Sequence, residues 1–188
     1  MAKKAKPARK AKAAKKAAKP KAPRKVQAIP KGYHTLTTGF CVRGAVQAID
    51  FYKRAFGAKE RMRLMKPDGA TVAHAELAIG DSLFMLGEED PAMGSRSAQA
   101  LGGTPVNLYL YVTGVDAAVA RAVAAGAKAV MPVTDMFWGD RIGSVEDPYG
   151  QKWTLATHKE DVAPREMAER GRAFYAKMAG SHERADHA

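Results

Sequence analysis

The chain lacks the features that mark secreted and membrane-spanning proteins. Its 188 residues include one cysteine, Cys41, which excludes a disulfide within the chain and fits a reducing compartment. No run approaches the roughly 18 apolar residues that a membrane helix needs. The basic N-terminus is not followed by an apolar stretch, as a secretory signal would be. We therefore expect a cytoplasmic protein with no membrane span.

Acidic residues are missing from the first 25 positions. The chain has 31 Lys and Arg against 19 Asp and Glu, a formal net charge of +12. Residues 1–25 hold twelve of the basic residues and no acidic one, which leaves 19 of each sign in residues 26–188. The folded part is therefore expected to be neutral, and the excess positive charge belongs to an N-terminal tail.

This tail contains only Ala, Lys, Arg and Pro after Met1, so it lacks the large apolar side chains that could offset the entropy of ordering, and we expect disorder. Its composition resembles the tails of linker histones. The resemblance and the charge imply non-specific, salt-sensitive binding to DNA or RNA, with nucleoid or chromatin association. A solubilising role, or attraction to another polyanion such as anionic lipid, is the alternative. The candidate contacts are the basic side chains, namely Lys3, Lys4, Lys6, Arg9, Lys10, Lys12, Lys15, Lys16, Lys19, Lys21, Arg24 and Lys25.

Hydrophobic periodicity predicts the same order of elements twice. In the first half we expect a strand over 34–43, a helix over 45–56, and strands over 58–65, 71–79 and 82–86. After a loop over 87–105, we expect a strand over 106–112, a helix over 115–125, and strands over 127–133, 141–146 and 151–157. Residues 42–49 align with 112–119 at a shift of 70, and residues 81–86 with 150–155 at a shift of 69. The chain therefore contains an internal repeat.

The closing hairpin carries the most specific motifs. Residues 132–158 contain WGDR, the turn DPYG and a final W-x-L strand; Pro at the second and Gly at the fourth turn position suit a type I turn. This combination resembles the vicinal oxygen chelate superfamily, which holds glyoxalase I, bleomycin-resistance proteins and extradiol dioxygenases, and within it the PhnB-like branch. Relatives of this fold commonly form dimers, so the resemblance also implies a homodimer.

Together these observations predict an α+β fold. It consists of two tandem βαβββ modules forming a cupped eight-stranded mixed sheet around a cleft, plus a C-terminal helix and a disordered N-terminal tail. We expect the tail over 1–30, the superfamily domain over 31–160, and the helix with a frayed end over 161–188. Within that last segment, Asp161 as N-cap and Pro164 in the first turn predict a helix to about Met178.

The resemblance places a possible metal site at four inward positions, the first and fourth strands of each module. In metal-dependent relatives these positions are typically His and Glu. Here they fall on Thr37, Met85, Asn107 and Thr154, and two hydroxyls, a thioether and an amide are poor ligands for a divalent cation. We therefore predict no metal and no other cofactor; a divalent metal bound elsewhere is the less favoured alternative.

Other residues are expected to line the same cleft. His74 and Glu76 lie two apart and share one face of a strand, as do Tyr109 and Tyr111 with Asn107. Trp138 lies in a loop over the closing hairpin, just before Arg141. Such a cleft would bind a small planar or anionic molecule, with the aromatic rings giving contact area and the polar groups orientation. The full set predicted to line the cleft is Thr37, His74, Glu76, Met85, Asn107, Tyr109, Tyr111, Trp138, Arg141 and Thr154.

Each of these residues also has a structural interpretation. His74 and Glu76 would form a hydrogen-bonded pair, the tyrosines are ordinary strand residues, and Arg141 would pair with Asp140 or Asp147. Three functions remain open on the sequence alone. The first is binding of a small organic molecule without metal or turnover. The second is an enzyme of the same fold, metal-dependent or metal-free, with His74, Glu76 and Arg141 as the catalytic candidates. The third is an interaction platform tethered to nucleic acid by the tail.

Overall fold

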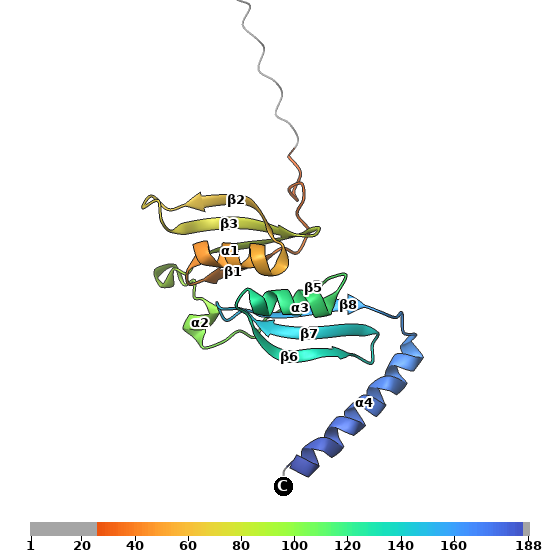
Figure 1. Ribbon diagram of the computed structural model, residues 1–188. Helices are drawn as coiled ribbons and strands as arrows, with labels where there is room; N and C mark the ends of the chain where they lie inside the picture. The colour runs from red at the N-terminus through yellow and green to blue at the C-terminus, as the bar shows by residue number, and fades with distance from the viewer. Residues whose placement is uncertain (1–25, 186–188) are drawn as a thin grey trace, which may run out of the picture.

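The computed structural model describes residues 26–185 (Figure 1). The predicted nucleic-acid contacts in residues 1–25 therefore lie outside the described residues. Within these, the element order is β1-α1-β2-β3-β4, a connection with two short helices, β5-α3-β6-β7-β8, and a final helix α4. The α+β class and the two tandem βαβββ modules are confirmed.

The bounds of the elements follow the predicted repeat. The first module consists of β1 (Thr38–Val42), α1 (Ala45–Phe56), β2 (Lys59–Met65), β3 (Val72–Ile79) and β4 (Ser82–Glu88). The connection holds η1 (Pro91–Met93) and α2 (Ala98–Leu101). The second module consists of β5 (Asn107–Tyr111), α3 (Val115–Ala124), β6 (Lys128–Asp135), β7 (Asp140–Glu146) and β8 (Lys152–His158), and α4 spans Pro164–Ala185.

The eight strands form two four-stranded mixed sheets. Their orders are β1-β4-β3-β2 and β5-β8-β7-β6, and in each sheet the first pair is parallel and the others are antiparallel. Figure 1 shows the sheets side by side, with β1 and β5 at the junction, and α1 and α3 on the same side of both. The two helices contact each other. Each sheet therefore has a helix-covered face and a second face, here called the open face.

Alternation along the strands determines which side chains reach the open face. In β3, Ala75 and Leu77 are fully buried, whereas His74 and Glu76, which alternate with them, are partly exposed, as the period of a strand requires. The alternation breaks once: His74 pairs with Leu64 and Val72 with Met65, so one residue of β3 is extra at this point. Such a bulge reverses the faces, and Val72 is buried in the core.

An aromatic cluster joins the two modules in the core. The ring of Tyr52 on α1 packs against Trp153 on β8 at a centroid distance of 5.6 Å, and Phe56 packs against the same indole at 4.6 Å. The Tyr52 hydroxyl and the Trp153 indole N–H both donate hydrogen bonds to the buried carboxylate of Asp147, at 2.8 and 2.9 Å. The β7–β8 turn and α1 are therefore joined by packing and by a polar contact.

Helix α4 extends away from the sheets (Figure 1). It continues to Ala185, beyond the predicted end near Met178. Phe137, in the turn before β7, packs against Phe174 and Tyr175 of α4 at ring distances of 5.3 and 5.9 Å. Among the described residues, no helix is both long and apolar enough to span a membrane.

Candidate functional site

Three hollows meet at the junction of the sheets. Their volumes are about 660, 610 and 560 Å³, within the range of small-molecule sites. Val106 lines all three, and Thr104 and Pro105 line the first two. The hollows are therefore neighbours along one depression, here called the trough.

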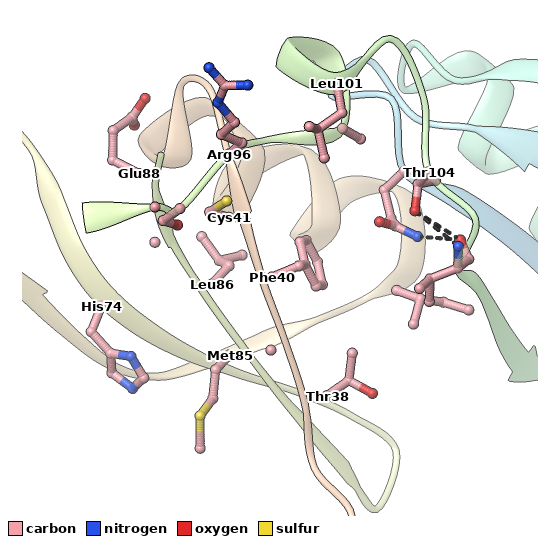
Figure 2. Close-up of a pocket in the computed structure, with 18 of the residues that line it drawn as sticks. Thr38, Phe40, Cys41, His74, Met85, Leu86, Glu88, Arg96, Leu101 and Thr104 are labelled. Atoms are coloured by element: carbon pink, nitrogen blue, oxygen red, sulfur yellow. Dashed lines mark hydrogen bonds between the residues drawn. The ribbon is translucent and has the colours of Figure 1, made fainter. Parts of the chain in front are cut away.

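The first hollow contains two of the predicted side chains, His74 and Met85 (Figure 2). They lie at one side of it, and Arg96 and Leu101 of the connecting segment lie opposite. Part of the lining of this hollow is a glycine, Gly87, because a side chain does not fit there. A Cβ at Gly87 would lie 2.7 Å from the Ala73 carbonyl oxygen, so this position of β4 cannot carry a side chain without moving β3.

The opposite wall is fixed by one carboxylate. Glu89 accepts hydrogen bonds from the Ser97 hydroxyl at 2.6 Å, the Ser97 N–H at 3.0 Å and the Arg43 guanidinium at 2.7 Å. The bonds from Ser97, reinforced by Arg43, lower the pKa of Glu89 to about 2. Ser97 also caps α2 by accepting from the Ala100 N–H. The segment that closes the first hollow is thus anchored to the end of β4.

His74 and Glu76 lie together as predicted, with 3.5 Å between His74 Nε2 and Glu76 Oε1 and both side chains partly exposed. The sequence did not indicate the third member of this group, Tyr33. Its hydroxyl hydrogen-bonds to Glu76, and this contact, with some desolvation, raises the pKa of Tyr33. Glu76 therefore lies close to two polar neighbours, and the His74 side chain remains partly exposed.

The four positions of the family's metal site do not converge. Thr37 precedes β1, because that strand begins at Thr38 and not at the predicted residue 34; its hydroxyl donates to the His34 carbonyl oxygen. Met85 lines the first hollow and Asn107 and Thr154 the second. The Asn107 amide donates to the Thr154 hydroxyl at 2.8 Å, and Ser144 bonds to the same hydroxyl at 2.9 Å.

These four residues do not fit a divalent cation. The amide and hydroxyls of the second hollow satisfy one another, and the thioether of Met85 is a ligand for soft metals only. Among residues 26–185, no group of three or more His, Cys, Asp or Glu side chains is placed to hold a metal ion. A metal of the glyoxalase type therefore has no suitable set of donors at the predicted positions.

The remaining aromatic candidates gather around a residue that the sequence did not single out. Asp140, with 4% of its surface exposed, accepts from the Tyr109 hydroxyl at 3.3 Å, the Tyr111 hydroxyl at 3.0 Å and the Trp138 indole N–H at 3.2 Å. His158 Nδ1 lies 2.7 Å from its other carboxylate oxygen. We call these five residues the Asp140 cluster. It lies on the open face of the second sheet and joins β5, β7 and β8.

The cluster maintains a buried negative charge. Burial alone would raise the pKa of Asp140, but hydrogen bonds from His158, Tyr111 and Trp138 outweigh it, so the pKa lies below its usual value. Asp140 and then Asp161, which lies 3.0 Å from His158 Nε2, raise the pKa of His158. Desolvation and the neighbouring carboxylate raise the pKa of Tyr109 to about 12. The phenol therefore stays protonated and continues to donate.

The prediction that Arg141 faces the cleft is wrong. Its guanidinium makes two hydrogen bonds to Asp116, in the first turn of α3, at 2.9 and 2.8 Å, and one to Asp135 at 3.1 Å. Arg141 alternates with Asp140 along β7, so the two side chains point to opposite faces. Its structural pairing is real, although with Asp116 and Asp135 and not with the expected Asp140 or Asp147.

Comparisons with known proteins agree with this fold. The family model for the Glyoxalase/Bleomycin resistance protein/Dioxygenase superfamily matches residues 34–155. A Mycobacterium tuberculosis protein is 43% identical over 130 residues, which cover 68% of this chain and 76% of that protein. The solved structure of TioX from Micromonospora sp. ML1 is 28% identical with a TM-score of 0.53, covering 65% of this chain and 97% of TioX. The PhnB protein from Bacillus cereus, 18% identical, shares the fold with a TM-score of 0.52 over 66% of this chain and 99% of its own. The chain belongs to the glyoxalase, bleomycin-resistance and dioxygenase superfamily.

Proposed function

We propose that this protein binds a small organic molecule in the trough and does so without the metal site of metal-dependent relatives. The observation that carries the proposal is the donor chemistry of the four family positions, where Asn107 and Thr154 bond to each other and Met85 lines a hollow of about 660 Å³. An apolar lining with a few polar groups is typical of a site that holds a ligand. The ligand replaces the metal as the occupant of this face.

Binding is tested with a variant that fills the first hollow. A Cβ at Gly39 would lie 3.9 Å from the Met85 Cβ, an ordinary contact distance, so Gly39→Leu is expected to occupy the hollow without distorting β1. A panel of small aromatic acids, alcohols and amines is titrated by calorimetry into both proteins. We expect at least one member to bind the parent and to lose tenfold or more affinity in Gly39→Leu. No binding by any member, or equal binding to both proteins, would contradict the proposal.

The competing function is an enzyme, favoured by the accessible His74 ring beside Glu76. Elemental analysis of the full-length protein purified without chelator, and of a His74→Ala, Glu76→Ala double variant, separates the two. We expect substoichiometric metal in both preparations. Stoichiometric metal that disappears in the double variant would identify a metal site at this pair and favour catalysis.

We infer a second activity for the basic tail, namely non-specific binding to nucleic acid and, with it, association with the nucleoid or chromatin. Residues 1–25 carry twelve cations and no acid, and each phosphate contact releases counterions. Deleting residues 1–25 is expected to raise the Kd for duplex DNA at least tenfold at low salt and to flatten its dependence on salt. Unchanged DNA affinity in the deleted protein would exclude the tail as the contact, and tight binding only to anionic vesicles would indicate a lipid partner.

We also infer a homodimer that forms through the edge strands β2 and β6. Met62 and Leu64 on β2 and Val130 on β6 expose 41, 57 and 48% of their surfaces on edge strands, an amount of apolar surface that a partner would bury. The solution mass is then twice the 20.2 kDa of one chain, and Leu64→Glu shifts it to the monomer. A monomeric parent protein in sedimentation equilibrium at micromolar concentration rules out the dimer.

A further inference from the structure

The third hollow, of about 560 Å³, has an unusual charge balance. It lies between the β3–β4 turn and β5, and among residues 26–185 the one charged residue that lines it is Asp81. The first hollow, in contrast, is lined by charges of both signs, Arg96 and Glu88, and so is the second, by Lys152 and Glu146. In the described part of the chain, the lining of the third hollow therefore offers no basic side chain to an anion.

Two tyrosines of the Asp140 cluster form one wall of this hollow. Tyr109 and Tyr111 expose 44 and 62% of their surfaces, and their ring centroids lie 5.3 Å apart at an angle of 51°. Both hydroxyls donate to the Asp140 carboxylate. The polar edge of each ring is thus fixed by a hydrogen bond, and ring surface remains free for a ligand.

The electrostatics of this wall favour positive charge. An aromatic face carries the negative part of the ring quadrupole and attracts cations, and a phenol that donates to a carboxylate gains electron density. Asp140 adds a charge that is buried and therefore weakly screened by salt. The nearby ring of His158 lies between two carboxylates, Asp140 and Asp161, so even in its protonated form it does not reverse the sign of the region.

We propose that the third hollow binds a small organic cation, an alkylammonium or arylammonium group seated on the faces of Tyr109 and Tyr111. Asp140 supplies the charge behind the rings, and Asp81 supplies a second carboxylate at the rim of the hollow. The proposal goes beyond the proposed function, because it adds a second site in the same trough and names the class of ligand that this site takes. It also replaces the expectation of an anionic ligand, which depended on Arg141 facing the cleft.

Benzyltrimethylammonium is the probe, with benzenesulfonate and benzyl alcohol as anionic and neutral partners of similar size. Each is titrated by calorimetry into the full-length protein at low salt. We expect the cation to bind at least tenfold more tightly than either partner. Tyr111→Leu keeps apolar contact area but removes the ring face, so we expect a tenfold loss of affinity. Tyr111→Phe keeps the face and is expected to lose threefold or less.

The controls separate this inference from the proposed function. Gly39→Leu fills the first hollow and leaves the third untouched, so it is expected to leave affinity for the cation unchanged. Equal or tighter binding of benzenesulfonate or benzyl alcohol overturns the cation site, as does undiminished cation binding by a folded Tyr111→Leu protein. If the cation fails but another panel compound binds and loses affinity in Gly39→Leu, the proposed function stands without this inference.

Discussion

Replacing Asp147 with Asn is expected to lower the free energy of unfolding by about 3 kcal/mol. One carboxylate oxygen accepts from the Tyr52 hydroxyl and the Trp153 indole, and the other accepts from the backbone N–H groups of Tyr149 and Gln151, both at 2.9 Å. An amide offers one oxygen and one NH₂ group, so two donors must face a donor. Burial raises the pKa of Asp147 against the effect of these four donors, so the net loss is smaller than the sum of the hydrogen bonds.

A double-mutant cycle with Tyr52→Phe tests the cause. In the parent protein, removing the hydroxyl should cost about 1 kcal/mol, because one bond to a buried carboxylate is lost. In Asp147→Asn the same change should cost less, because the single amide oxygen cannot accept from both pairs of donors and the bond from Tyr52 is weakened or lost. Urea denaturation of the four proteins gives the coupling. Additive effects, or a loss below 1 kcal/mol for Asp147→Asn alone, would show that packing of the aromatic rings holds the modules together without this carboxylate.

The turn that contains Asp147 shows what can be predicted from neighbouring residues in the sequence and what cannot. Pro148 and Gly150 indicate a type I turn, and the Gly150 N–H indeed donates to the Asp147 carbonyl oxygen at 3.0 Å. The repeat of two βαβββ modules was predictable for the same reason, since hydrophobic period and glycine positions are local properties. The contact between the Asp147 side chain and Tyr52 is not local, since 95 residues separate the two. No pattern near the turn indicates that contact.

The misplaced Arg141 has a particular physical origin. The internal repeat pairs it with Val72, and both side chains lie on the helix-covered face, so the alignment itself was correct. Strict alternation from His74 back to Val72 placed Val72 on the open face, whereas the extra residue in β3 reverses the faces between them. Backbone bulges leave little trace in a sequence, so the repeat could not give the face of Arg141. Alternation within β7 itself gives it, because Asp140 and Ile142 share the face opposite to Arg141.

Most of the predicted cleft residues lie on the expected face of their sheet, but they do not converge on a single site. His74 and Met85 line the first hollow, Asn107 and Thr154 the second, and Tyr109 and Tyr111 the third. The face on which a side chain lies follows from the two-residue period of its strand. Whether residues of the two sheets come together depends instead on how the sheets are placed side by side. Asp140 had a usable signal that was missed. Two tyrosines and a tryptophan on one face need acceptors for their O–H and N–H groups, and Asp140 is the carboxylate nearest to Trp138 along the chain.

A methyl group added at Gly139 is expected to destabilise the protein by about 3 kcal/mol, through strain and lost hydrogen bonds. Gly139 has a φ of +96°, and a Cβ there would overlap the Glu160 carbonyl oxygen and lie 3.1 Å from Val162 Cγ2. Its own carbonyl oxygen accepts from the N–H groups of Lys159 at 2.8 Å and Glu160 at 3.1 Å. Gly139→Ala must therefore push the chain after β8 away from the turn before β7.

The matched control is Gly69→Ala in the β2–β3 turn. Gly69 also has a positive φ, +67°, but nothing lies within 4 Å of its Cβ position, so this change should cost only the backbone strain of roughly 1 kcal/mol. Displacing residues 159–162 in Gly139→Ala also moves Asp161 away from His158 and loosens the attachment of α4. Limited proteolysis should therefore cut Gly139→Ala near residue 160 at least tenfold faster than it cuts either Gly69→Ala or the parent protein. If the two alanine variants unfold at the same urea concentration and are cut equally slowly, backbone strain alone explains both, and the segment before α4 does not depend on close contact with Gly139.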